Sequence, residues 1–121
     1  MKKKNIFRVS WMVFPFDVLV CLGSTRCEVL AKIEKLGYQL DDEERSKIVM
    51  FGKGRTVILK RGQTILWLNK RPKKGDSVLA HEIFHAVAFI LDRIGIPMEP
   101  SCDELPAYMI QYLTEEINDN L

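Results

Sequence analysis

Both histidines of the chain fall in one pentapeptide, His81-Glu82-Ile83-Phe84-His85. Residues four apart lie on the same face of an α-helix, so the two imidazoles would point the same way and could hold one metal ion. Glu82 is turned about 100° around the helix from His81, where it could reach a metal-bound water rather than the metal. Two nitrogen ligands with a carboxylate beside the water suit metal-assisted hydrolysis, and zinc fits this ligand set best.

A catalytic zinc ion usually has three protein ligands and one open position. Because the chain has no third histidine, the remaining ligand must be Asp, Glu or Cys. Glu104 is the best candidate, 19 residues after His85 in the first turn of the next predicted helix, which a short helical hairpin would bring alongside the first. Ser101 and Glu104 also have the spacing of a capping box, in which the glutamate bonds the backbone instead. The nearby substitutes as third ligand are Asp103, Cys102 and Glu99.

A hydrolytic site also needs a group that stabilises the oxyanion. With no histidine left for this role, a tyrosine is the candidate, either Tyr108 or Tyr112. Tyr108 lies one helical turn after Glu104 and would face the same side. A tyrosine packed in the core with its hydroxyl at the edge explains Tyr108 equally well.

The elements that must position these groups predict a single α+β domain over residues 1–121. A small twisted sheet, made of an N-terminal strand plus a β-hairpin, would pack on the helical pair that carries the HExxH motif and the third-ligand Glu. The strand before the first of these helices, residues 64–69, could pair with an extended substrate or be an ordinary sheet strand. The predicted elements are one or two strands within 5–22 (16–22 the better candidate), helices 25–36 and 41–47, a hairpin of strands 56–59 and 64–68, and helices 77–94 and 101–118.

The residues around the motif resemble a known family. Residues 78–87, with only uncharged residues flanking the two histidines, are similar to the extended zincin pattern, and residues 103–108 look like the second motif of gluzincin metallopeptidases. The chain also resembles the small HExxH proteins of the ImmA/IrrE type found in mobile elements. The resemblance covers roughly residues 77–113, and it implies that His81, His85 and Glu104 are zinc ligands and that Glu82 is the general base. The sequence departs from the thermolysin-like pattern at Tyr108, where that group has an aspartate.

Charge divides the chain into two halves. Residues 1–75 carry 17 Lys and Arg against 7 Asp and Glu, whereas residues 76–121 carry one Arg against nine acidic residues. The acidic half contains the metal motif, and the basic half could face nucleic acid or an acidic partner. A solvated surface is the favoured interpretation, because a nucleic-acid site would need the basic residues on one face. Those residues are Lys53, Arg55, Lys60, Arg61, Lys70, Arg71, Lys73 and Lys74.

The three cysteines are odd in number and lack CxxC spacing, which favours free thiols in a reducing compartment such as the cytoplasm. No apolar run reaches the roughly 18 residues of a membrane helix. The basic start followed by residues 11–23 could be mistaken for a signal peptide, but Pro15 and Asp17 interrupt that stretch, and a buried strand is the preferred interpretation.

Three functions are compatible with these features. The first is a zinc metallopeptidase, possibly a regulatory one of narrow specificity, that acts on a protein or peptide substrate. The second is a non-catalytic regulatory or binding module with a structural or vestigial zinc site, and the third is a nucleic-acid or partner-binding protein that the metal only stabilises. Glu82 favours the first, because a structural zinc site has no use for an unliganded glutamate at that position. The oligomeric state is left open.

Overall fold

The computed structural model describes residues 4–11 and 13–121 and shows an α+β protein, as the sequence predicts. The strands are β1 (Ile6–Ser10), β2 (Asp17–Leu22), β3 (Gly54–Ile58) and β4 (Thr64–Leu68). The helices are α1 (Arg26–Lys35), α2 (Asp42–Lys47), α3 (Ser77–Ile94) and α4 (Glu104–Asn118), and a single 3-10 turn, η1 (Pro100–Cys102), precedes α4.

The four strands form one mixed sheet in the order β1-β2-β4-β3. The two inner strands, β2 and β4, run parallel, and each outer strand pairs antiparallel with its neighbour. Of the one or two strands predicted within residues 5–22, two form: residues 6–10 and 17–22 fold back on each other, so the sheet has two N-terminal strands beside the hairpin. Met12, in the same stretch, lies outside the described residues.

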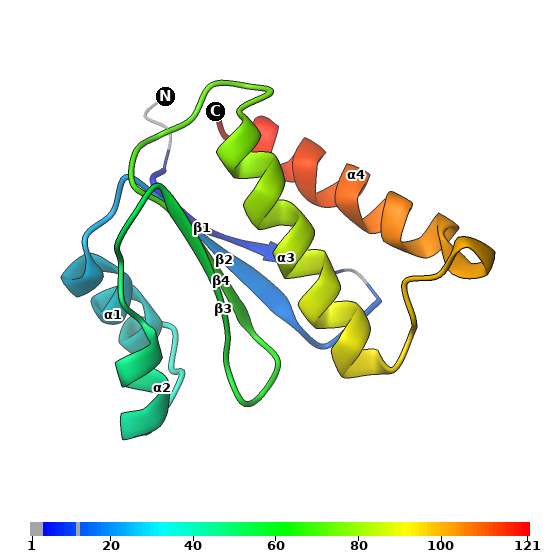
Figure 1. Cartoon of the computed structure of the whole chain (residues 1–121). Coiled ribbons are helices and arrows are strands. Elements are labelled where there is room, and N and C mark those ends of the chain that lie inside the picture. Colours follow the sequence, from blue (N-terminus) through cyan, green and yellow to red (C-terminus); the bar gives the residue numbers. More distant parts are fainter. Residues whose placement is uncertain (1–3, 12) are drawn as a thin grey trace.

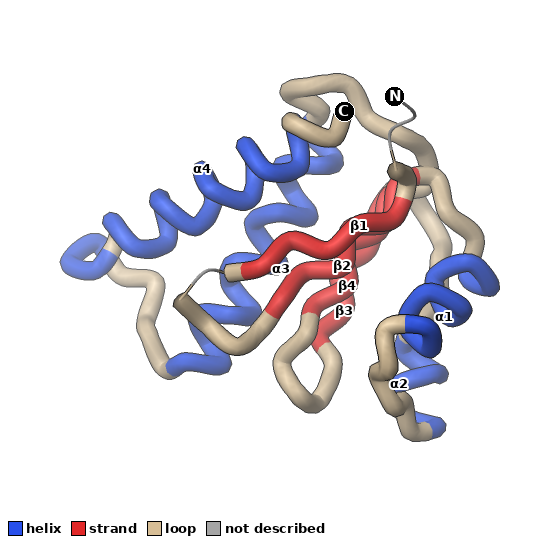
Figure 2. Tube along the Cα trace, turned by 180° about the vertical axis from the view of Figure 1, so that it is seen from behind, coloured by secondary structure: helices blue, strands red, loops and turns tan. Residues whose placement is uncertain are grey.

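Helices cover both faces of the sheet (Figures 1 and 2). Side chains alternate along β2, so that Val18 and Val20 pack beneath α3 and α4 while Leu19 and Cys21 face α1 and the segment after α2. The predicted layout placed the sheet only against the α3–α4 pair. The second layer on the opposite face explains why both inner strands are almost entirely buried.

Helix α3 has clear start and stop signals. The Asp76 side chain accepts a hydrogen bond from the Leu79 amide at 3.0 Å and caps the first turn. Gly95 ends the helix in the left-handed region (φ 75°), and the Ile96 amide bonds back to the Leu91 carbonyl at 2.9 Å. One face of the helix is buried along its length, and the rest of its circumference points to solvent or to neighbouring elements. The buried residues are Leu79, Glu82, Ile83, Ala86, Val87, Ile90 and Leu91.

The last helix begins three residues later than predicted. Residues 100–102 form the turn η1 instead of a first helical turn, and α4 begins at Glu104 with no side-chain cap. The capping box between Ser101 and Glu104 does not form, since the Ser101 hydroxyl contacts Glu99 and Cys102. The Tyr112 hydroxyl donates to the Ser10 carbonyl at 2.6 Å and ties the middle of α4 to β1. Among the described residues, none of the helices is both long and apolar enough to cross a membrane.

The packing of β2 makes a prediction about thiol chemistry. Cys21 is fully buried, and burial raises the pKa of its thiol to about 12, whereas Cys27 and Cys102 are exposed. We expect a thiol reagent at pH 8 to label Cys27 and Cys102 of the folded protein rapidly and Cys21 only on unfolding, because the thiolate is the reactive form. Mass spectrometry of labelled peptides with and without denaturant measures this. Rapid labelling of Cys21 in the folded protein would contradict the placement of β2.

Candidate metal and hydrolytic site

The HExxH residues lie near the start of α3 and divide between its buried and exposed faces. His81 is exposed and His85 is half-buried, while Glu82 is only 6% exposed. Successive residues of a helix are about 100° apart around its axis. Glu82 therefore belongs to the buried face, while His81, one residue before it, and His85, three residues after it, lie toward the exposed side. The two imidazoles are thus accessible to a ligand from solvent.

The two imidazoles converge as the spacing predicts. The Nε2 atoms of His81 and His85 lie 3.1 Å apart, and the ring centroids are 4.6 Å apart. Two nitrogens bound at about 2.05 Å to one tetrahedral zinc ion would lie about 3.3 Å apart. The observed separation is close to this value, and it is also that of a hydrogen bond in which one imidazole donates to the other. The ring of Phe89, one helical turn after His85, lies 6.2 Å from the imidazole between centroids, with the two ring planes 26° apart.

The carboxylate of Glu82 is held by the neighbouring strand β3. The hydroxyl of Thr56 lies 2.6 Å from Glu82 Oε1 and 3.2 Å from the Glu82 carbonyl oxygen, so it donates mainly to the carboxylate. A hydrogen bond to a charged acceptor compensates for part of the water that a buried carboxylate loses. Because Thr56 engages Oε1, Oε2 is the oxygen available to accept a proton.

Gly54 makes room for this contact. A Cβ atom at Gly54 would lie 3.0 Å from Glu82 Cγ, and equally close to side-chain atoms of Leu68 and Val78. That distance is shorter than ordinary van der Waals contact, so a larger residue would push α3 and β3 apart. The absence of a side chain at position 54 allows the helix to approach the strand closely enough for the Thr56 hydroxyl to reach Glu82.

These groups border a surface hollow of about 450 Å³ between β3 and the first turns of α3. His81 and Glu82 line it together with Gly54 and, at its outer end, Lys53. The hollow places the buried carboxylate and an exposed imidazole on one accessible surface. A water molecule or a small polar group bound there would meet both.

The other predicted site residues are not brought to this surface. Glu104 is exposed at the start of α4. This end of α4 lies well away from the middle of α3 in both views (Figures 1 and 2). The reason is the length of α3: it continues nine residues past His85, about 14 Å, before the chain turns toward α4. Within residues 4–11 and 13–121, no three His, Cys, Asp or Glu side chains form a group able to hold a metal ion. Asp103, Cys102 and Glu99, the predicted substitutes, are also exposed around η1.

Tyr108, the predicted oxyanion donor, faces a different part of the surface. It is 64% exposed and borders an apolar groove with Trp11, Phe14 and Met109, which shares no residue with the hollow beside His81. The alternative, Tyr112, donates its hydroxyl to the backbone of β1. The structure thus brings the imidazoles of His81 and His85 together and places His81 and Glu82 on one hollow, while Glu104 and Tyr108 keep their roles only as predictions from sequence.

The strand beside the motif is β3, not the segment predicted to receive a substrate. Residues 64–69 contain β4, which is paired on both sides and has no free edge. Of the two interpretations of this segment, the structure therefore supports the ordinary sheet strand and not the substrate-binding strand. β3 is an edge strand of the described sheet. Hydrogen bonds from Asn69 to Lys53 and from Leu59 to Gln63 set the antiparallel pattern. By alternation, the backbone groups of the even-numbered residues 54, 56 and 58 point to the free edge.

Basic residues lie at both ends of the β3–β4 hairpin. Lys60 lies at the turn that joins the strands, where it pairs with Asp41 and Glu43. Lys53 and Lys70 lie at the opposite end, next to the start of α3. These three lysines are therefore not clustered at one end of the hairpin.

A comparison with protein-family models, curated proteins and solved structures finds no match to this chain. The site is therefore interpreted from its own geometry. Sequence reasoning missed Gly54, which precedes the predicted strand 56–59, and Thr56, which is the first residue of that strand. The sequence shows that residues 54 and 56, two apart in a strand, point to the same face of the sheet. It does not show that this face meets Glu82, because that depends on which strand α3 covers.

Removing the Thr56 hydroxyl tests the contact that holds Glu82. We expect Thr56→Val to lower the free energy of unfolding at pH 7 by about 1–3 kcal/mol, because it leaves a buried carboxylate oxygen without its donor. Thr56→Ser, which keeps the hydroxyl, is the matched control and should lose less. Urea denaturation followed by circular dichroism measures both variants. Equal losses for Val and Ser would show that the hydrogen bond contributes nothing.

Removing one imidazole tests the metal pair. We expect His85→Ala to lower the zinc bound per chain and to abolish the rise in melting temperature that zinc gives the parent, because binding to the folded state stabilises it. Elemental analysis and thermal unfolding with zinc or with chelator measure the two effects. In chelator, parent and variant should melt within a few degrees of each other. Undiminished zinc content in the variant would rule out His85 as a ligand.

Proposed function

We propose that the protein hydrolyses peptide bonds with a divalent metal ion, best matched by zinc, held by His81 and His85. The observation that carries the proposal is the 3.1 Å approach of the two Nε2 atoms beside a buried, oriented glutamate. A pair of histidines on the buried face of a helix has many structural explanations. Two accessible histidines whose Nε2 atoms lie 3.1 Å apart have far fewer, and a metal ion shared by both rings is one of them.

The residues of the chain have distinct roles in this proposal. When bound, the ion supplies a water molecule whose pKa is lowered toward neutrality. Glu82 Oε2 accepts the proton of that water and later gives it to the leaving amine. Thr56 holds the other carboxylate oxygen, so that Glu82 stays in place between these steps. Glu104 as third ligand and Tyr108 as oxyanion donor are kept from the sequence pattern, and the proposal does not depend on either.

The free edge of β3 supports a peptide as the substrate. The residues that border Glu82 from the strand side, Gly54 and Thr56, also present their backbone groups to that edge. An extended peptide that pairs with β3 would therefore run past the hollow with its backbone held by main-chain hydrogen bonds. This mode of binding places a peptide bond, rather than a side chain, beside Glu82.

The second candidate function is a non-catalytic module that keeps the same metal ligands for stability. The burial of Glu82 against Thr56 is the observation in its favour, because a carboxylate so held also serves to join α3 to β3. The two functions differ in the expected effect of removing the negative charge at position 82: only the catalytic function predicts a loss of peptide hydrolysis.

Replacing the general base separates them. We expect Glu82→Gln to retain zinc and melting temperature, since its amide oxygen still accepts from Thr56, and to lower peptide hydrolysis by about 100-fold to 10,000-fold. Cleavage of a degenerate peptide library, followed by mass spectrometry, measures activity in the zinc-loaded parent and variant. A variant as active as the parent would remove Glu82 from the mechanism. A zinc-loaded parent that cleaves none of the peptides would favour the non-catalytic module.

A further inference from the structure

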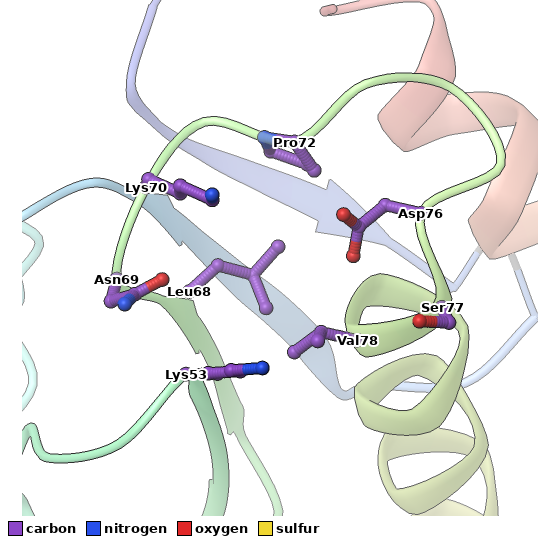
Figure 3. Close-up of a pocket in the computed structure, with 8 residues that line it drawn as sticks. All are labelled: Lys53, Leu68, Asn69, Lys70, Pro72, Asp76, Ser77 and Val78. Atoms are coloured by element: carbon purple, nitrogen blue, oxygen red, sulfur yellow. The ribbon is translucent and has the colours of Figure 1, made fainter.

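A second cavity continues from the hollow beside Glu82 toward the start of α3 (Figure 3). It has a volume of about 260 Å³ and shares Lys53, Ser77 and Val78 with the hollow. Leu68 and Val78 form an apolar floor, and the rim is polar except for Pro72. The two cavities therefore form one surface that extends from the candidate hydrolytic groups to the loop after β4.

The rim of this cavity carries two lysines from different segments. Lys53 comes directly before β3 and Lys70 follows β4, and Figure 3 shows both side chains directed across the cavity toward α3. Neither forms an ion pair with another described residue, whereas Lys47 and Lys60 both have acidic partners. The acidic residue on the opposite rim, Asp76, is engaged as the cap of α3. Two cations thus face one carboxylate that is already hydrogen-bonded.

The position of the lysines relative to β3 gives the direction of a bound peptide. Antiparallel pairing is somewhat more stable than parallel pairing, so a substrate strand on the free edge of β3 would run opposite to it. Its C-terminal part then passes the first residue of β3 and reaches Lys53. Residues that follow the cleaved bond would lie over the cavity between Lys53 and Lys70.

We propose that Lys53 and Lys70 select substrates with a carboxylate on the C-terminal side of the cleaved bond. The carboxylate belongs either to an acidic side chain or to the free C-terminus of the substrate, and the same two ammonium groups would bind both. This inference rests on the proposed peptide hydrolysis, because it names the substrate class of that site. The apolar floor formed by Leu68 and Val78 would contact the aliphatic part of the same substrate residue.

Matched peptides test the selection. From a peptide that the zinc-loaded parent cleaves, four versions are made with Glu or Gln after the cleaved bond and with a free or an amidated C-terminus. We expect kcat/KM for at least one carboxylate version to exceed that of the neutral, amidated version by about 10-fold, and the excess to shrink at high salt because exposed charges are screened. The version that gains identifies which carboxylate is bound.

Variants assign the preference to the two lysines. Lys53→Gln and Lys70→Gln should each reduce the ratio of acidic to neutral cleavage toward one, while Lys74→Gln, in the nearby loop but outside the cavity lining, should leave the ratio unchanged. Equal cleavage of all four peptides by the parent would overturn the selection and leave the proposed hydrolysis standing. An unchanged ratio in both cavity variants would overturn the assignment to Lys53 and Lys70.

A binding measurement keeps the two proposals separable. If the parent cleaves nothing, the hydrolysis proposal fails, and the affinity of zinc-loaded Glu82→Gln for the same fluorescently labelled peptides decides the selection. Tighter binding of the carboxylate versions, lost in Lys53→Gln and Lys70→Gln, supports it. Equal affinity for acidic and neutral versions overturns it.

Discussion

The close contact between α3 and β3 at Glu82 constrains the rest of the site. A buried carboxylate is stable only with a hydrogen-bond donor beside it, and the donor here comes from the edge strand. The strand can come near enough because residue 54 has no side chain. Once Glu82 is fixed against β3, the rotation of α3 about its own axis is fixed as well. The helical period then places His81 and His85 on the accessible flank, whatever else contacts the helix.

The site also lies where the two charged halves of the chain meet. Glu82 and the histidines belong to the acidic C-terminal part, whereas β3 and the lysines at its end belong to the basic N-terminal part. The fold brings these halves together by laying α3 over β3 and β4 (Figure 1). The fold therefore places Lys53 and Lys70 of the basic half beside the first turns of α3 in the acidic half.

Local signals in the sequence predicted most of the elements and the convergence of the two imidazoles. The spacing of His81 and His85, the capping residue Asp76 and the terminal Gly95 each act within a few residues, so they can be read without the fold. The strand that faces the motif could not be read in this way, because it depends on the order β1-β2-β4-β3. The position of Glu104 also depends on where a nine-residue connection leads after α3 ends. Spacing along the chain gives no direction for such a connection, and the predicted approach of Glu104 to His85 assumed a short one.

The open edge of β3 has a consequence for how the protein behaves at high concentration. An unpaired strand that can accept a peptide can also accept the same strand from another molecule, which is the usual beginning of sheet-to-sheet aggregation. Here the edge strand is only five residues long, and Lys53, which forms no ion pair with a described residue, stands just before it. Short edge strands and charged side chains at the edge are two ways in which natural sheets discourage such self-association. The edge can thus remain accessible to a single extended chain while opposing growth into larger assemblies.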